Sequence, residues 1–500
     1  MLAIIAVVVL LPYFECVYLP DKIEEGMLNG SKDAIYRNRL GAARITLLDH
    51  EGNPAALTDI QVLPASLNFK LGAGVWTTTA NASWTQNDWN YYQNTGFEYE
   101  QIWTTWRLIE PKENQFDFSS VQGQIDYVRA HNPRAKFFVR LQGIVPDPLV
   151  GESLSDSTPP SFTGFSSKFP ADSSAYLQEV RTYVRTLVSK YARDIDVWIT
   201  PIEINRVDYA MSAFNLSNPP WSIEEAIEVD RVITSAVKQA NPAAVVALGT
   251  SLPLSEFERE DATKIDPLDF ERAATAFHIP FDVVAVETYG FSGDLAFWSR
   301  YLGEISSLGR PIFINEVGYS SVGFDVLGLE TAADKQSFWY QGILSLALGS
   351  RDIMGLFFLE FKDRTVQQRY SKFETMGLLD FSGKPKASYK TTVALLENLT
   401  QSHEDSSLQG EVTIRVLAGN YTITAFSMEG EFEVHENQTL AYTAQPGNNG
   451  QLRISRTQTS GSQSLGSGEA GRLATLEPIT SVLLPRREQI SQQLCRRNVL

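Results

Sequence analysis

From residue 66 onward the chain repeats one pattern eight times: a short run of apolar, β-branched or aromatic residues, then a longer segment with helical spacing. This alternation is typical of a parallel sheet whose strands are joined by helices. An open sheet of this size more often carries a nucleotide-binding fingerprint, so we expect an α/β fold with a closed (β/α)8 TIM barrel over residues 68–400. The expected strands are residues 68–75, 98–106, 136–144, 196–204, 243–251, 282–289, 311–318 and 353–361, and the clearest expected helices are residues 173–193, 222–240 and 331–348.

The segments on either side of this barrel have strand-like patterns. Residues 40–67 alternate apolar and polar side chains around a turn, which predicts a β-hairpin extension. Residues 408–455 predict a small all-β module, which packs beside the barrel or, alternatively, binds carbohydrate. Residues 456–500 are expected to be a linker and tail. Their G-x-G-x-x-G match at 466–471 follows no strand and opens no helix, so we do not interpret it as a nucleotide site.

The first twenty residues contain an apolar run that stops at Pro12. Its length fits the core of a secretory signal peptide better than a membrane span. A retained anchor and a mis-assigned start are the alternatives, because basic residues before the run and a clean cleavage site after it are both missing. Six Asn-x-Ser/Thr sequons are compatible with a secreted glycoprotein: Asn29, Asn81, Asn215, Asn398, Asn420 and Asn437.

The charge balance restricts the partners of the chain. With 42 basic and 59 acidic residues the net charge is −17, which disfavours nucleic acid and anionic membrane surfaces and suits a neutral substrate. Two cysteines at opposite ends of the chain predict no disulfide framework, and five histidines without ligand spacing predict no metal. We therefore expect no cofactor. The sequence does not indicate an oligomeric state.

Carboxylates follow apolar strands at several places. Glu316 ends the strand at 311–318, Glu203 and Glu287 end two others, and Glu360 is a weaker fourth case. In a (β/α)8 barrel the carboxyl ends of the strands carry the catalytic groups, and glycoside hydrolysis needs two carboxylates from such positions. An ion pair without catalytic function is the alternative for any one of them.

These motifs together carry a family resemblance over about residues 40–398. Segment 106–118 is similar to the W-x-x-I-E-P stretch of clan A glycoside hydrolases, most closely those of family 10, the endo-β-1,4-xylanases. Further matching segments are 198–203, 281–289, 311–318 and 376–389. The resemblance implies a retaining double displacement with Glu316 as nucleophile and Glu203 as general acid/base. It also implies that Tyr289 donates a hydrogen bond to Glu316.

The chain departs from the family where the sugar would bind. Ile202 stands where the clan has an asparagine, segment 101–106 lacks the family's Asn and Lys, and Leu359 replaces an expected tryptophan. Xylan specificity therefore does not carry over. Of the aromatic candidates, Trp103 and Trp106 are expected to stack on sugar rings or to belong to the core. The expected substrate-binding residues are Trp76, Trp103, Trp106, Arg140, Gln142, Asn205, Glu287, Tyr289, Asn315 and Phe358.

The sequence therefore predicts a secreted retaining glycoside hydrolase that acts on a β-linked polysaccharide or oligosaccharide. A non-catalytic carbohydrate-binding protein on a degenerate barrel is one alternative, motivated by the lost sugar contacts. The other is an exo-acting clan A β-glycosidase such as a β-galactosidase or β-glucuronidase, where Arg140 would favour a uronic acid.

Overall fold

A computed structural model describes thirteen stretches of the chain. They are residues 19–55, 60–75, 84–145, 159–165, 173–205, 221–251, 266–290, 295–321, 332–364, 375–400, 403–406, 411–447 and 449–457. These residues belong to two compact units. One unit comprises residues 70–320 and 352–385, and the other comprises the remaining segments.

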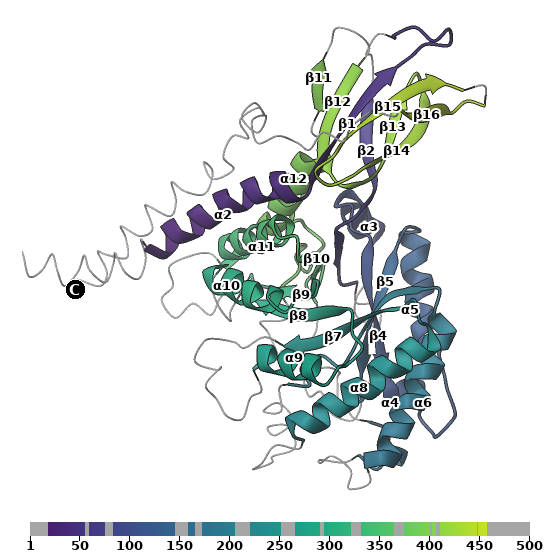
Figure 1. Cartoon of the computed structure of the whole chain (residues 1–500), viewed down its shortest axis with the longest axis vertical. Coiled ribbons are helices and arrows are strands. Elements are labelled where there is room, and N and C mark those ends of the chain that lie inside the picture. The colour runs from purple at the N-terminus through teal and green to yellow at the C-terminus, as the bar shows by residue number, and fades with distance from the viewer. Residues whose placement is uncertain are drawn as a thin grey trace, which may run out of the picture. The chain divides into compact units, whose positions relative to one another are not determined.

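The first unit contains a closed barrel of eight parallel strands, as the alternation predicts (Figure 1). Each strand overlaps its expected range and is shorter than that range. The fourth strand, β6, begins one residue before its expected range and ends at Ile199, so Glu203 lies beyond the strand. The strands are β3 (Lys70–Ala73), β4 (Tyr99–Thr105), β5 (Lys136–Gln142), β6 (Ile195–Ile199), β7 (Val245–Ser251), β8 (Val283–Tyr289), β9 (Ile312–Gly318) and β10 (Ile353–Phe358).

Helices of the same unit alternate with these strands, and α8 and α9 pack against β7 (Figure 1). The start of α8 has the capping box that its sequence indicates, in which Ser222 and Glu225 bond each other's backbone amide. Pro267 opens α9 after the N-cap Asp266. The helices are α3 (Gln86–Asn94), α4 (Trp106–Ile109), α5 (Ser119–His131), α6 (Ser173–Tyr191), α8 (Ile223–Ala240), α9 (Pro267–Ala276) and α10 (Leu295–Ser306), with a short 3-10 turn η2 (Ser161–Thr163).

An apolar layer fills the lower interior of the barrel. Phe138 of β5 lies at its centre, with its ring edge-on to Phe313 at 5.2 Å and to Phe357 at 4.8 Å. The other members of the layer are Tyr99, Val197, Ile199, Ile202, Ala247, Val283 and Ala285. Such filling is usual for this barrel, and it leaves only the carboxyl ends of the strands for polar chemistry.

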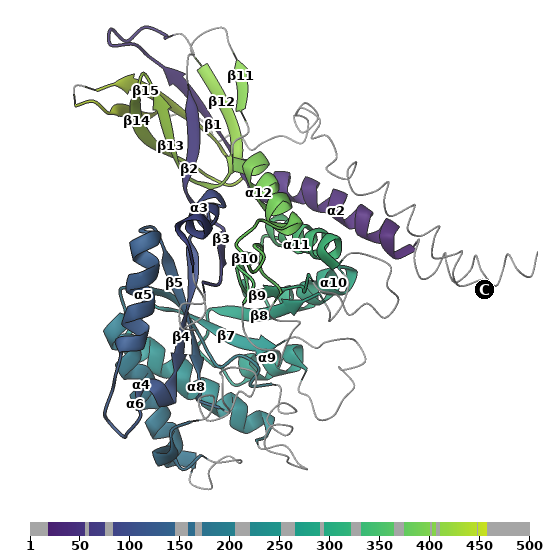
Figure 2. The same cartoon turned by 180° about the vertical axis from the view of Figure 1, so that it is seen from behind.

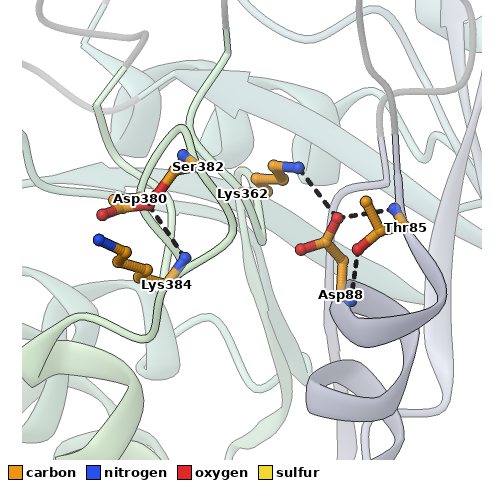
Figure 3. A network of polar contacts seen from close by, with 6 residues as sticks. All are labelled: Thr85, Asp88, Lys362, Asp380, Ser382 and Lys384. Carbon is orange, nitrogen blue, oxygen red and sulfur yellow. Dashed lines mark hydrogen bonds and ion pairs between the residues drawn. The ribbon is translucent and has the colours of Figure 1, made fainter.

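A polar network in this unit joins α3 to the segment after β10 (Figure 3). Asp88 accepts a hydrogen bond from Lys362 Nζ at 2.9 Å and from the backbone of Thr85 at 2.7 Å. Nearby, Asp380 accepts from the backbone amides of Ser382 and Lys384, which closes a tight turn. Because the Asp88 carboxylate is buried and paired with Lys362, it fixes α3 to the segment after β10.

The second unit contains two sheets that enclose their own apolar core (Figure 2). A five-stranded sheet has the order β11-β12-β1-β15-β16, and a three-stranded sheet has the order β14-β13-β2. The strands are β1 (Leu40–Leu47), β2 (Gln61–Leu67), β11 (His403–Ser406), β12 (Glu411–Leu417), β13 (Gly419–Ala425), β14 (Met428–Val434), β15 (Thr439–Pro446) and β16 (Leu452–Thr457). Helix α2 (Leu19–Asn38) packs along α11 (Ala332–Gly349), which contacts α12 (Ala387–Thr400).

The expected N-terminal hairpin is wrong in its pairing. A turn does form, with a bridge between Leu48 and Pro54, but β1 pairs with β12 on one side and β15 on the other. No edge of β1 remains for β2, which pairs instead with β13 in the other sheet. Residues 40–67 thus complete the C-terminal β module, which begins earlier than residue 408.

Several expectations lie outside the described residues. These are the signal-peptide or anchor run at 1–18, Trp76, and the linker and tail from residue 458. Within the part of the chain that the structure describes, no helix combines the length and the hydropathy required to cross a membrane.

Candidate active site

A cluster of three charged side chains lies above the apolar layer, at the carboxyl ends of the strands. Arg140 Nη1 is paired with Glu316 Oε1, and Arg140 Nη2 is 3.2 Å from Glu287 Oε1. All three side chains are at most 3% exposed. With both carboxyls ionised, these three side chains carry a net charge of −1. Burial of such a group is costly, which makes this cluster a candidate functional site.

The period of two along the strands aims two of these side chains inward. On β5, Phe138 belongs to the apolar layer, so Arg140 also faces the interior. On β8, Ala285 belongs to that layer, and Glu287 follows it on the same face. Apolar residues below and charged residues above are therefore encoded by alternate positions of the same strands.

Strand β9 contains a one-residue irregularity where the third side chain lies. Val286 of β8 pairs with Ile314, but the next residue, Glu287, pairs with Glu316. Asn315 is therefore an extra residue, and β10 shows a register shift at the same place. Bulges of this kind are frequent next to active sites, where they re-aim a side chain.

The extra residue determines the direction of Glu316. Phe313 faces the interior, so strict alternation would turn Glu316 toward the outside of the barrel. With Asn315 inserted, Glu316 shares the inner face with Glu287 and meets Arg140. The bulge thus creates the carboxylate cluster.

Tyr289, the last residue of β8, donates its hydroxyl hydrogen to Glu316 Oε2. The ring of Tyr289 reaches this position because Gly318 has no side chain: a Cβ there would lie 2.7 Å from Tyr289 Cδ1 and would also meet Met376 Sδ. Glu316 is therefore held by a cation on one oxygen and by a hydroxyl on the other. Both contacts stabilise its ionised form.

Two buried side-chain amides near this cluster have no hydrogen-bond partner among the described residues. Neither the oxygen nor the nitrogen of the Gln142 or Asn315 side chain has a hydrogen-bond partner among the described residues. Gln142 is the last residue of β5 and is 5% exposed, and Asn315 is fully buried. Amides of this kind can hydrogen-bond sugar hydroxyls as both donor and acceptor. Trp103, whose ring lies 5.2 Å from the Arg140 guanidinium, is half-buried.

Glu203 lies in a turn after β6 rather than on the strand. Its backbone is left-handed, with φ of 66°, and its side chain is partly exposed. A non-glycine residue in this conformation carries a strain of about 1–3 kcal/mol, and such strain is concentrated at functional sites. The preceding Ile202 packs into the apolar layer, so no polar group stands at that position.

Three expected substrate-binding residues have other roles in the structure. Trp106 is fully buried, stacks on Tyr183 at 5.0 Å and donates to Glu110, so it is a core residue. Phe358 is fully buried and packs on Phe97, whereas the preceding residue, Phe357, lies in the barrel interior.

The Asn205 amide is also engaged by the protein. Its nitrogen donates to the Ser251 carbonyl at 2.9 Å, and its oxygen accepts from the Ser251 amide at 3.0 Å. Both bonds tie the turn after β6 to the end of β7. Glu360, the weaker carboxylate candidate, is buried and pairs with Arg364 at 2.9 Å.

Sequence reasoning did not single out Gly318 or the bulge at Asn315. A glycine two positions after a candidate nucleophile is a usable indication that another group approaches closely. The bulge has no such indication, because one inserted residue does not change the apolar character of the strand. Among the described residues, no group of three or more His, Cys, Asp or Glu side chains is arranged as metal ligands.

Comparisons with known proteins support the fold. GH5_18 from Streptomyces cattleya, solved with GlcNAc, superposes with a TM-score of 0.50 at 16% identity, covering 67% of this chain and 81% of that one. An exo-β-1,4-mannosidase from Opitutaceae bacterium strain TAV5 gives 0.48 at 17%, covering 71% and 62%. Xylanase 10B from Thermotoga maritima gives 0.47 at 15%, covering 66% and 95%.

No family model matches the chain, and no curated protein matches it in sequence. At 16% identity the likeness to GH5_18 from Streptomyces cattleya shows the barrel fold alone. It does not establish the reaction or the residues that carry it.

Proposed function

We propose that this protein is a retaining glycoside hydrolase that cleaves β-linked polysaccharides or oligosaccharides. One observation carries the proposal: Glu316, aimed inward by the bulge, contacts the Arg140 guanidinium and the Tyr289 hydroxyl, and both contacts favour its ionised form. An ionised carboxylate at this end of the barrel is what a nucleophile of this reaction class requires.

Glu203 is the proposed general acid/base. Glu203 lies in the turn after β6, at the carboxyl ends of the barrel strands. Its strained, left-handed backbone supports a functional role. In the first step Glu203 protonates the leaving oxygen while Glu316 attacks the anomeric carbon, and in the second step Glu203 takes a proton from water. A distance of about 5–5.5 Å between the two carboxyl groups is expected for this mechanism.

Labelling of the nucleophile tests the proposal directly. Dinitrophenyl fluoroglycosides of glucose, galactose, mannose and xylose should inactivate the protein, and digestion should place the sugar on Glu316. Glu316→Gln should abolish labelling, and Glu203→Gln should lower hydrolysis by about 10²–10⁴-fold. Glu271→Gln, which removes a buried carboxylate of α9 outside the cluster, should label at the normal rate. The proposal fails if no glycoside is hydrolysed and no sugar is attached.

One observation favours a carbohydrate-binding protein without hydrolysis. Ile202, which is buried in the apolar layer, leaves no hydrogen bond from its position to the sugar. The unpartnered amides of Gln142 and Asn315 would then serve binding alone. Calorimetric binding of an oligosaccharide, with neither turnover nor labelling, would identify this function. The uronic acid alternative would require Arg140 to bind the substrate carboxylate while its two terminal nitrogens also contact Glu287 and Glu316.

Secretion is also proposed. Three of the sequon asparagines, Asn29, Asn398 and Asn420, are exposed on the described surface, where a glycan could be attached. Expression in a eukaryotic host should place the protein in the medium, with a mass that falls after treatment with an N-glycosidase. Retention in the cell with an unchanged mass would contradict it.

A further inference from the structure

The three-membered charge cluster contains one carboxylate more than the proposed reaction needs. Glu316 is the proposed nucleophile and Arg140 holds it, but Glu287 occupies the second terminal nitrogen of the same guanidinium. Glu287 is 2% exposed and lies beside Glu316 in the ladder of β8 and β9. A second buried carboxylate raises the electrostatic cost of the site, so its presence requires a reason.

We infer that Glu287 is a positioning residue that neutralises Arg140 during the part of the cycle in which Glu316 carries the sugar. This inference rests on the proposed function. The buried charge around Arg140 changes at each stage of the double displacement.

The first step changes the charge of Glu316. Its carboxylate oxygen forms a bond to the anomeric carbon, the bond from that carbon to the leaving oxygen breaks, and Glu203 gives that oxygen a proton. Glu316 is then a neutral ester, and the cluster passes from −1 to zero because Glu287 still balances Arg140. In the second step water adds to the anomeric carbon, its proton goes to Glu203, and Glu316 leaves as a carboxylate.

Without Glu287 the same step would pass from zero to +1. The ester would leave the Arg140 guanidinium, itself 3% exposed, as an uncompensated buried cation. An unpaired buried charge is strongly unfavourable, so formation of the glycosyl-enzyme would be opposed. Its hydrolysis would not be opposed, because that step restores the carboxylate beside the cation. Glu287 thus favours the first step selectively.

The test compares the two steps in Glu287→Gln, which keeps the side-chain shape and removes the charge. Dinitrophenyl fluoroglycosides of glucose, galactose, mannose and xylose report the first step as the rate of inactivation and the second as the rate of reactivation. We expect inactivation to slow by about tenfold or more and reactivation to be unchanged or faster. The acid limb of kcat/KM should move to lower pH by about one unit, because a like charge beside Glu316 is lost.

Glu287→Asp keeps the charge and provides the rescue. It should restore the ratio of the two rates and the position of the acid limb, even where both rates fall through altered distance. Equal slowing of both steps in Glu287→Gln, or an unmoved acid limb, would show that Glu287 has only a structural role. If Glu287→Gln does not fold, a selective loss of inactivation in Glu287→Asp would overturn the inference. A wild-type protein that is neither labelled nor active would refute the proposed function itself.

Discussion

Removal of the Glu271 carboxylate is expected to stabilise the protein at neutral pH. Glu271 lies on α9, is fully buried, and accepts a hydrogen bond from Thr250 Oγ1 at 3.1 Å. Burial raises the pKa of this carboxyl from 4.5 to about 8, with the Thr250 bond acting in the opposite direction. At pH 7 the folded protein therefore holds a proton on Glu271 that the unfolded chain has released.

The sign and size of the effect follow from proton linkage. Because the pKa is raised in the folded state, the stability contribution of Glu271 is complete below pH 4.5 and is lost as the pH rises toward 8. Each pH unit within this window lowers the free energy of unfolding by about 1.4 kcal/mol, which amounts to about 3 kcal/mol at pH 7. Glu271→Gln resembles the protonated acid at every pH, so it should be more stable than the parent by about that amount at pH 7.

Urea unfolding followed by circular dichroism, at half-unit steps between pH 4.5 and 8, measures this difference. The gap between Glu271→Gln and the parent should widen steadily with pH. Asp269→Asn, on the exposed face of the same helix, is the matched control, because its 68% exposed side chain makes only a surface ion pair with Arg272. A constant gap across the range would refute the reasoning that burial governs this group.

Two glycines provide further predictions. Gly318→Ala should cost about 1–3 kcal/mol of stability and, by pushing the Tyr289 ring away from Glu316, should lower kcat/KM by roughly tenfold or more; unfolding and steady-state rates measure both. In Gly383→Ala the left-handed backbone alone should cost about 1–2 kcal/mol of stability. The total loss should be larger, because the new Cβ would also meet the buried Asp88 carboxylate. Thermal unfolding at fixed pH measures this loss.

Each glycine has a control elsewhere in the same unit. Gly303→Ala on α10 and Gly309→Ala meet nothing within 4 Å, and Gly309 also has a positive φ of 70°. Gly303→Ala should be neutral or stabilising with unchanged activity. Gly309→Ala should show the backbone cost without the clash. An equal loss for Gly383→Ala and Gly309→Ala would mean that Asp88 moves aside freely.

The barrel could be predicted from the sequence because its information is local. Each strand is an apolar run between helical segments, and each run can be recognised from its own residues. The partner strands of β1 and of β2 could not be predicted, because these partners lie more than 350 residues away in the chain. Strand existence is thus a property of a short segment, whereas strand partnership is a property of the whole fold.

Side-chain direction was predictable only where alternation is regular. Arg140 and Glu287 follow interior apolar residues by two positions, and both side chains lie in the cluster with Glu316. Phe358 was misassigned because a shift of one position moves a side chain to the other face of its strand. Of the two alternatives stated for Trp106, the structure places it in the core, where α4 begins and the period of two no longer applies.

The two carboxylates that we propose as catalytic both stand where regular backbone is interrupted. Glu316 follows the extra residue of β9, and Glu203 has a left-handed backbone beyond the end of β6. Neither departure improves packing: the bulge leaves a buried amide without a partner among the described residues, and the left-handed turn is strained. Natural proteins break local rules mainly where function demands it. The coincidence of both departures with the two carboxylates is therefore an argument for catalysis that does not depend on resemblance to any family.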